Sequence, residues 1–391
     1  MSLPLENIRV VEFTHAVMGP SAGLILGDMG ADVIHVEPVE GDTTRLLKGF
    51  GQGFFSCYSR NKKSLAIDIK SPEGKKIIYQ LLSTADVLIE NFGPGTMDRL
   101  GYGYEELKEQ FPKLIYCSLK GFLPGPYEKR HAMDEVVQMM GGLAYMTGRP
   151  GDPLRAGTSI VDITGGMFGC MGILLALYER AKTGAGKLVK AGLFETTAFV
   201  MGQHMALSAL TGKPVPPMPA RLSPWSIYRI FNTADDQQVF IGIISEKHWK
   251  RFCDVFDRPD WLVDERLQTN NQRVDAKDWF MPEVEKMILH FTKQEVLAKC
   301  EEAGITFAPI STTEDLFTDE HLSKSGALLD VRLTDGTLTR LPKTPIDYEG
   351  AEITLRYQPP AIGEHTATIL TELGYTVAEI EVLQNKKIIA E

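Results

Sequence analysis

The sequence predicts an α/β protein with a doubly wound parallel sheet and a second, smaller α/β domain. Strand-like and helix-like patterns alternate over the first 200 residues, which is typical of parallel βαβ units. The chain has 391 residues and is longer than one ordinary domain. The proline-rich segment 214–219 is typical of a linker. Together these observations predict two domains.

The expected elements of the large domain follow one another at short intervals. Apolar runs predict strands at 8–13, 31–36, 64–69, 85–90 and 114–119. Helices are expected at 19–29, 73–82, 162–182 and 196–210. Parallel sheets bind ligands in the loops that follow their strands. We therefore expect function in the loops 14–19, 38–44, 70–72, 91–95 and 120–125.

The second half of the chain predicts a small domain and a returning tail. A strand at 239–244 precedes amphipathic helices, and the tail combines a β-like stretch, proline-rich turns and a final helix after Thr376. The expected boundaries are 1–213 for the large domain, 225–325 for the small domain and 326–391 for the C-terminal segment.

The composition is that of a soluble globular protein, with 43% hydrophobic and 24% charged residues. The net charge of −10 argues against a nucleic-acid partner. Five widely spaced cysteines predict reduced thiols, with neither a zinc site nor a disulfide frame. The chain begins without a signal-like segment, and its longest apolar stretch, near 167–177, is broken by glycines and short for a bilayer. We therefore expect a cytoplasmic protein without a membrane partner or a metal site.

Asp162 is a lone carboxylate in the apolar, glycine-rich run 157–168. An ionised carboxylate in such surroundings loses hydration and needs either a partner or a chemical role. A helix N-cap is the alternative interpretation. Asp134 precedes an apolar helix, so an N-cap is its default interpretation.

The first strand-to-helix turn resembles a dinucleotide-binding turn only in outline. The glycine fingerprint GxGxxG is absent from 14–19, which disfavours nicotinamide binding. Gly19, Gly23, Gly27 and Gly30 are instead expected to permit close packing of the helix on the sheet.

Several polar residues follow the predicted strands. The Asn91 amide and the Phe92 ring are candidates for ligand contact, although a tight turn with a satisfied asparagine explains 90–95 equally well. His15 is either a ligand contact or a hydrogen-bonded edge histidine. Phosphate ligands need two or three basic residues. The candidates, each otherwise a solvated surface charge, are Arg45, Lys70, Arg99 and 129–131.

Motifs spread over nearly the whole chain carry a resemblance to one family. The matching stretches are 5–14, 30–38, 41–45, 61–68, 90–95, 141–143, 161–162, 180–184, Glu195 and 363–366. In this order and spacing they resemble the class III CoA-transferases, the formyl-CoA transferase and CaiB/BaiF family. The resemblance implies a Rossmann-like large domain built from both ends of the chain, an inserted small domain and an interlocked homodimer. It also implies coenzyme A as a substrate, in the form of acyl-CoA, with no permanently bound cofactor.

The family nucleophile falls on Asp162. The resemblance implies a mixed anhydride, then an aspartyl-CoA thioester, on the way from an acyl-CoA to a small carboxylic acid. It also implies that Gly165, Gly166 and Gly169 let the pantetheine thiol approach. The family's CoA positions fall here on Val17, Met18, Ile67–Lys70, Asn91, Phe92, Gly93, Arg99 and Arg130–Met133, a range that contains His131. His15 is a further candidate because it directly follows the first strand. Asp134 is a candidate auxiliary residue.

Two departures bear on the substrate. Pro38 stands where a basic residue is often found, and Val17 stands where formyl-CoA transferase has a glutamine near its active site. That enzyme's glycine-rich loop also has no counterpart in the small-domain region. Formyl and oxalate are therefore disfavoured, and a succinyl-CoA-like donor with a dicarboxylate or other short acid is expected.

Two other functions compete with CoA transfer. A 2-methylacyl-CoA racemase needs two bases, typically a His-Asp pair that is Met133-Asp134 here, and His131 lies two residues early and is expected to point elsewhere. A CoA-ester-binding protein without catalysis is the third interpretation, and the intact Asp162 argues against it.

Overall fold

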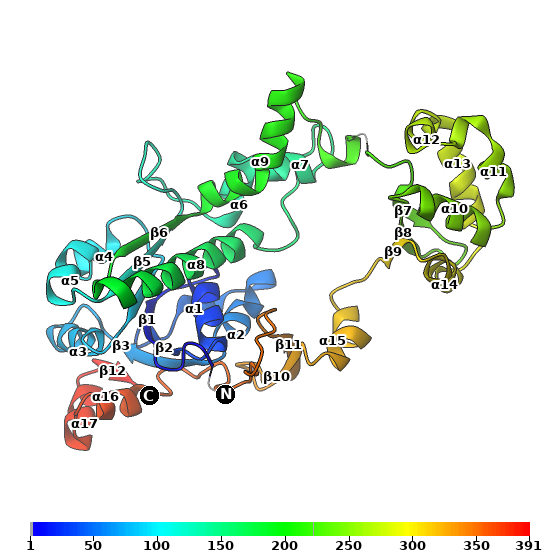
Figure 1. Ribbon diagram of the computed structural model, residues 1–391. Helices are drawn as coiled ribbons and strands as arrows, with labels where there is room; N and C mark the ends of the chain where they lie inside the picture. Colours follow the sequence, from blue (N-terminus) through cyan, green and yellow to red (C-terminus); the bar gives the residue numbers. More distant parts are fainter. Residues whose placement is uncertain (1–2, 222) are drawn as a thin grey trace. The chain divides into compact units, whose positions relative to one another are not determined.

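The computed structural model describes residues 3–221 and 223–391, and the chain divides into two compact units. The large unit comprises Met1–Ala220 together with Lys324–Glu391, and the small unit comprises Arg221–Ser323. Figure 1 shows the chain coloured along its sequence, with the blue N-terminal and the red C-terminal elements in the same unit. The large unit is therefore built from both ends of the chain.

The centre of the large unit is a seven-stranded sheet in the order β12-β3-β2-β1-β4-β5-β6. Its strands are β1 (Arg9–Phe13), β2 (Asp32–Glu37), β3 (Lys62–Ile67), β4 (Val87–Glu90), β5 (Ile115–Lys120), β6 (Leu188–Gly192) and β12 (Ile389–Ala390). All pairs are parallel except β12 with β3. The predicted α/β class with a parallel sheet is confirmed. The sequence did not predict β6, which is short and contains Lys190, or the two-residue β12.

Helices cover both faces of this sheet. One face packs against α1 (Met18–Asp28) and α8 (Ile160–Thr183). The other packs against α3 (Pro72–Leu82), α4 (Thr96–Leu100), α5 (Tyr104–Gln110), α16 (Thr366–Glu372) and α17 (Val377–Asn385). A Cβ at Gly19, Gly23 or Gly27 would lie 3.0 Å or less from Thr14, Glu12 or Asn61. These glycines therefore permit the close packing of α1 that the sequence predicts.

The remaining elements of the large unit surround the ends of the sheet. Two short 3-10 helices, η1 (Thr43–Leu46) and η2 (Gly49–Gly53), lead into α2 (Phe54–Tyr58). After β5 come α6 (Asp134–Met140) and α7 (Leu143–Thr147), and after β6 come α9 (Leu193–Thr211) and η3 (Met218–Ala220). The tail contributes a hairpin of β10 (Leu328–Arg332) and β11 (Leu338–Pro342).

The buried Asp28 carboxylate joins the tail to the N-terminal part of the large unit. Asp28, at the end of α1, pairs with Arg60 at 2.7 Å, and both side chains are buried. The same carboxylate accepts hydrogen bonds from the Thr344 N–H and hydroxyl at 3.1 and 2.8 Å. A buried carboxylate is stable only when such donors surround it. The tail therefore completes the large unit's structure.

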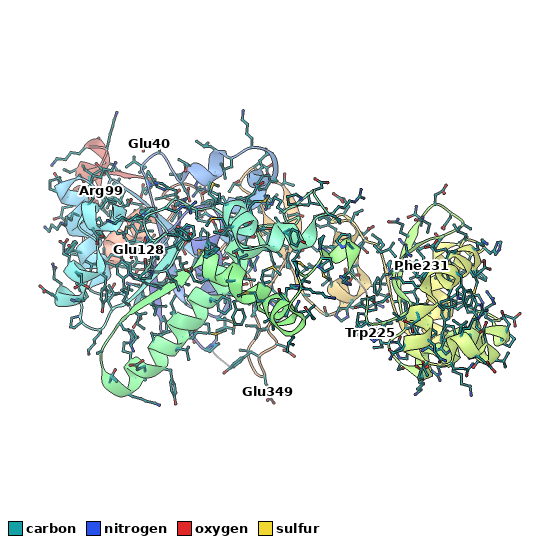
Figure 2. The ribbon with its side chains drawn as sticks, turned by 90° about the horizontal axis from the view of Figure 1, so that it is seen from above. Glu40, Arg99, Glu128, Trp225, Phe231 and Glu349 are labelled. Carbon is teal, nitrogen blue, oxygen red and sulfur yellow. The ribbon has the colours of Figure 1, made fainter. Side chains whose placement is uncertain are left out.

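The small unit has its own sheet and core. Its antiparallel strands are β7 (Tyr228–Asn232), β8 (Gln238–Gly242) and β9 (Thr306–Pro309), accompanied by α10 (Glu246–Val255), α11 (Pro259–Val263), η4 (Glu265–Leu267), α12 (Asn270–Asp275), α13 (Lys277–Ile288) and α14 (Lys293–Ala303). Two further short helices, η5 (Asp315–Phe317) and α15 (Glu320–Lys324), follow. Trp249 and Trp261 stack in the core, the edge of Phe280 contacts both, and Phe231, labelled in Figure 2, is buried in the same core.

Helix α8 corrects one expectation from the sequence. Its 24 residues are long and apolar enough to span a bilayer by length and composition, whereas the sequence suggested a stretch too short to do so. The helix continues past both ends of 167–177 because its glycines pack against α1, β5 and β6 rather than breaking it. Buried helices of soluble proteins pass the same test.

Candidate active site

Asp162 lies in the first turn of α8, and a second carboxylate caps that helix. The N–H groups of Val161 and Asp162 donate to Oδ2 of Asp134 at 2.8 and 3.0 Å. Ser159, the N-cap residue of α8, makes no capping hydrogen bond with its side chain. Both N-cap interpretations from the sequence are therefore wrong. Asp162 caps nothing, and Asp134 caps α8 rather than its own helix α6, because the fold brings the two helix starts together.

Asp134 is itself held firmly. It is 6% exposed, and its Oδ1 accepts hydrogen bonds from Gln138 at 2.5 Å and from the Arg155 guanidinium at 3.5 Å. The Gln138 side chain in turn accepts the Ala156 N–H at 2.9 Å, and Arg155 donates to the Thr158 carbonyl at 3.2 Å. This network fixes the loop before α8, and with it the backbone of Asp162.

The Asp162 carboxylate has charged neighbours but no hydrogen bond of its own. Within residues 3–221 and 223–391, neither of its oxygens accepts one. Burial, and then the negative charge of Asp134, raise its pKa to about 7, while Arg155 opposes the rise. A poorly solvated carboxylate without donors is a stronger nucleophile than a hydrated one. Asp162 thus has the properties of a reactive group and lacks those of a structural one.

A cleft of about 270 Å³ in the large unit opens onto Asp162. It brings together most of the residues that the sequence singled out, namely His15, Val17, Met18, Asn91, Phe92, Gly93, Arg130, His131, Met133 and Asp162. Apart from Met18 at the start of α1 and Asp162 in α8, these residues come from the loops after β1, β4 and β5, as expected for a parallel sheet. His131, which the sequence suggested would point elsewhere, lines the same cleft as Asp162.

Five predicted CoA positions, Ile67–Lys70 and Arg99, lie off this cleft. Ile67 is 1% exposed in the hydrophobic core and pairs with Ile389 of β12, so its side chain lies away from solvent, and its role as a CoA contact stays a prediction. Lys70 and Arg99 are exposed. Arg99 donates to the Thr96 hydroxyl at 2.8 Å, and Figure 2 labels it at the surface of the large unit.

Asn91 acts on the backbone of the cleft wall. Its Oδ1 accepts the His15 N–H at 3.0 Å, and its Nδ2 donates to the His15 carbonyl at 2.9 Å. The satisfied asparagine that the sequence left open is therefore what the structure shows, although the residue also lines the cleft. The rings of His15 and Phe92 lie 5.6 Å apart. These contacts join the loops after β1 and β4 into one surface.

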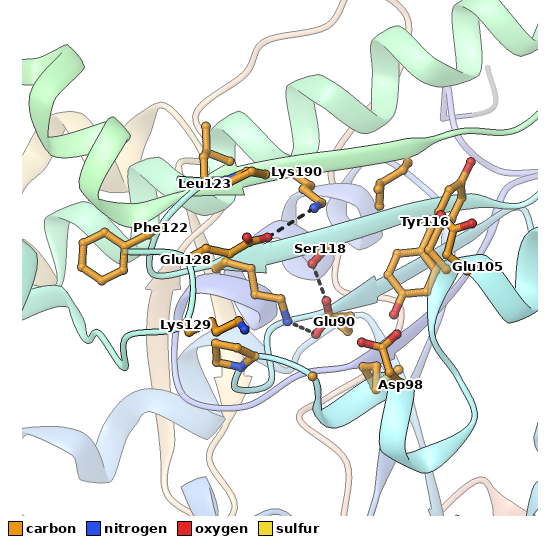
Figure 3. Close-up of a pocket in the computed structure, with 17 residues that line it drawn as sticks. Glu90, Asp98, Glu105, Tyr116, Ser118, Phe122, Leu123, Glu128, Lys129 and Lys190 are labelled. Atoms are coloured by element: carbon orange, nitrogen blue, oxygen red, sulfur yellow. Dashed lines mark hydrogen bonds and ion pairs between the residues drawn. The ribbon is translucent and has the colours of Figure 1, made fainter. Parts of the chain in front are cut away.

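Glu90 organises the turn that carries Asn91, and sequence reasoning missed this role. Its buried carboxylate accepts hydrogen bonds from Ser118 at 2.5 Å and from Lys120 at 2.6 Å (Figure 3). Lys120 also donates to the Phe92 carbonyl at 2.7 Å. The signal available in the sequence was the alternation of Ser118 and Lys120 on β5, which places both on one face. A second cleft, of about 410 Å³, lies beside this group along β5 and β6.

Arg130 is exposed and is held by aromatic rings. Its guanidinium lies 4.9 Å from the ring of Tyr127 and 5.7 Å from that of Phe122. Cation–π contacts of this kind orient the group without neutralising its charge. The side chain is therefore available to an anionic ligand in the cleft.

The glycines of α8 lie against neighbouring elements of the large unit. A Cβ at Gly165 would lie 2.7 Å from Met18, one at Gly166 would lie 2.1 Å from Ser21 Oγ, and one at Gly169 would lie 2.6 Å from Leu119. They therefore permit the packing of α8 on α1 and β5, and the approach of the pantetheine thiol to them stays a prediction. Among the residues that the structure describes, no three His, Cys, Asp or Glu side chains gather to hold a metal ion.

The comparisons with known proteins agree with one another. Residues 5–366 match the model of CoA-transferase family III. A succinate–glutarate CoA-transferase of Agrobacterium fabrum is 33% identical over 389 residues, covering 95% of this chain and 96% of the relative. A formyl-CoA:oxalate CoA-transferase of Rhodopseudomonas palustris is 32% identical, covering 97% and 96%.

A solved structure supports the same assignment. The crystal structure of a CaiB/BaiF family protein from Brucella suis superposes with a TM-score of 0.85 at 31% identity, covering 95% of this chain and all of that one. The resemblance predicted from the motifs is confirmed. The chain is a member of CoA-transferase family III and is an enzyme of that class.

Proposed function

We propose that Asp162 carries CoA from an acyl-CoA donor to a small carboxylic acid. A carboxylate oxygen of Asp162 attacks the thioester carbonyl, the C–S bond breaks and CoA leaves as its thiolate. The thiolate attacks the Asp162 carbonyl of the resulting anhydride, which releases the donor acid and leaves an aspartyl-CoA thioester. The observation that carries this proposal is the Asp162 carboxylate, which lines the cleft without a hydrogen-bonded partner.

The second half of the reaction reverses the first. The acceptor carboxylate attacks the aspartyl thioester and expels the thiolate, which then attacks the acceptor's carbonyl and regenerates Asp162. Helix α8 offers little oxyanion stabilisation at Val161 and Asp162, since those N–H groups bond to Asp134. The start of α1 at Met18 has no side-chain cap and lies on the cleft wall, so its N–H groups are the proposed donors.

The cleft residues are the proposed CoA contacts. Val17 and Met18 are nearly fully buried, so they contribute mainly backbone and packed surface. Arg130 is the proposed partner of a phosphate inside the cleft. Lys70 and Arg99, exposed beyond it, are proposed to meet phosphates of the nucleotide end.

The proposed substrates are dicarboxylic. The relatives' names include succinate with glutarate, and oxalate with formyl-CoA. Val17 and Pro38 depart from the formyl-CoA transferase pattern. A succinyl-CoA-like donor and a small dicarboxylate acceptor therefore fit better than formyl-CoA and oxalate.

A second copy of the chain is the proposed cover for an exposed apolar face. Met167, Met171, Leu175 and Tyr178 of α8 are each more than half exposed at helical spacing. On α9, Phe199 is 73% and Leu210 86% exposed. Such an extended apolar surface is typical of an interface. We propose the interlocked homodimer, for which sedimentation equilibrium should give twice the chain mass of 43.4 kDa; a monomer would contradict it.

The proposed compartment is the cytoplasm. All five cysteines are free, which suits a reducing environment.

The mechanism predicts the path of an oxygen atom. Each turnover leaves one acceptor oxygen on Asp162 and releases one Asp162 oxygen with the donor acid. With an ¹⁸O-labelled dicarboxylate acceptor, the peptide containing Asp162 should gain about 2 Da per oxygen incorporated by mass spectrometry. Asp162→Ala should lower exchange by at least ~10³-fold and retain CoA binding. The mechanism would be refuted if Asp162→Ala transferred CoA at the native rate. It would also be refuted if the native enzyme transferred CoA and left no label in this peptide.

A second candidate function is that of a 2-methylacyl-CoA racemase. His131 and Asp162 line the same cleft, so two groups able to exchange protons face one ligand space. A racemase would exchange the α-proton of a 2-methylacyl-CoA for deuterium without an acceptor acid. A transferase would not, and that exchange assay separates the two.

A further inference from the structure

One wall of the Asp162 cleft has a strained backbone. Ala16 lies between the cleft residues His15 and Val17, and its φ is +59°. Residues with a Cβ disfavour this left-handed conformation, which persists only where neighbouring groups hold it. Asn91 fixes the backbone of His15 on one side. Ala16 itself is held by a different residue.

The hydroxyl of Thr44 holds the backbone of Ala16. Its Oγ1 accepts the Ala16 N–H at 2.9 Å, and Thr44 is only 4% exposed. The same hydroxyl donates its single hydrogen to Oδ1 of Asp42 at 2.8 Å, and the Thr44 N–H donates to that oxygen at 2.8 Å. Because the hydrogen points to Asp42, a lone pair of the oxygen is left for Ala16.

Asp42 is in turn fixed by a buried chain of charges. His35 Nε2 lies 3.5 Å from Asp42 Oδ2, and His35 Nδ1 lies 3.0 Å from Glu12. Glu12 pairs with Lys62 at 2.7 Å. Burial lowers the pKa of His35, but the neighbouring carboxylates of Asp42 and Glu12 outweigh it and raise the pKa to about 9. These charged groups thus lie between the sheet core and Asp42, with a 3.5 Å separation and no hydrogen bond between His35 Nε2 and the Asp42 carboxylate.

We propose that Thr44 is a positioning residue for acyl-CoA: its hydroxyl, oriented by Asp42, sets the conformation of the cleft wall at Ala16. This inference rests on the proposed function, since the cleft must be the acyl-CoA site. The residue touches no substrate itself. Its removal should therefore weaken CoA binding while the chemistry at Asp162 continues.

The test compares Thr44→Val with Thr44→Ser and with Thr43→Val. The first removes the acceptor, the second keeps it, and the third makes the same chemical change at an exposed neighbour. Binding of CoA is measured by titration calorimetry, and KM and kcat are measured with succinyl-CoA. Thr44→Val should raise the Kd for CoA and the KM about 10-fold or more, with kcat within ~3-fold. Thr44→Ser and Thr43→Val should stay within ~2-fold of native values.

Thr44→Ala is the second variant, used if the valine does not fit, and it should reproduce the rise in Kd. Native Kd in both Thr44→Val and Thr44→Ala would overturn the proposal. So would equal impairment of Thr44→Ser, because the hydroxyl would then not matter. A native enzyme that binds no CoA and transfers none would instead refute the proposed function, which keeps the two failures distinct.

Discussion

Two acids in the large unit, the buried Glu12 and the half-buried Asp162, have opposite surroundings. Burial raises the pKa of Glu12, but Lys62 at 2.7 Å and His35 at 3.0 Å outweigh it and hold that pKa below its usual value. Burial also raises the pKa of Asp162, and its neighbour Asp134 raises it further, to about 7. Burial acts in the same direction on both carboxylates. The partner decides whether the carboxylate is structural or reactive.

The surrounding backbone supports each role. Gly23 leaves room for Glu12, because a Cβ there would lie 1.9 Å from the Glu12 carboxylate. No comparable group surrounds the Asp162 carboxylate. Asp162 bonds to Asp134 through its backbone N–H and not through its side chain. A helix start fixes the position of the side chain and leaves its oxygens unbonded. The proposed nucleophile is thus held in place through its backbone, and its carboxylate oxygens accept no hydrogen bond from the described residues.

The largest expected effect follows from removing the partner of Glu12. Lys62→Met should leave the buried Glu12 carboxylate with His35 as its remaining charged partner and destabilise the protein by ~3–5 kcal/mol in urea unfolding. Lys63→Met is the matched control, because Lys63 pairs with the partly exposed Asp32. It should cost at most ~1 kcal/mol. Equal losses in the two variants would show that the Glu12 pair is not structural.

A smaller effect of opposite sign is expected at Asp162. Its raised pKa means that the folded state binds more protons than the unfolded state between about pH 4 and 7. The native protein therefore loses stability as pH rises through that window. A rise from 3.8 to about 7 corresponds to at most ~4 kcal/mol, and partial exposure reduces this to ~1–2 kcal/mol. Asp162→Asn should be more stable than the native protein by that amount at pH 8 and equal to it at pH 4.

Asp278 provides the control for this measurement. It is an exposed aspartate in the first turn of α13, where an ionised carboxylate favours the helix. Asp278→Asn should therefore lower stability slightly at pH 8, by ~0.5 kcal/mol. Thermal unfolding at the two pH values measures both variants. A stabilisation of Asp278→Asn as large as that of Asp162→Asn would remove the distinction between them.

The sequence predicted what depends on local pattern and could not predict what depends on tertiary contact. The five strands and the glycine-packed α1 follow from apolar periodicity and residue size. Asp162 was identifiable because a carboxylate is out of place in an apolar run. The capping of α8 by Asp134 was not predictable, because Asp134 and Asp162 are 28 positions apart and meet only when α6 and α8 pack. The hydrogen bonds between Asn91 and His15 join residues 76 positions apart and could not be predicted for the same reason.

The smallest effect tests which neighbours set the reactivity of Asp162. Asp134→Asn removes a negative charge, so ionisation of Asp162 becomes easier and the acid limb of the pH–rate profile should move down by ~0.5–1 pH unit. Arg155→Met removes a positive charge, so the limb should move up by a similar amount, and Arg155→Lys should restore it. Both substitutions loosen the loop before α8, since both side chains bond to it. Loosening alone would lower the rate of both variants and shift neither limb, or shift both in one direction. Opposite shifts can come only from opposite charges acting on one carboxylate, so two shifts of the same sign would refute the electrostatic account of Asp162.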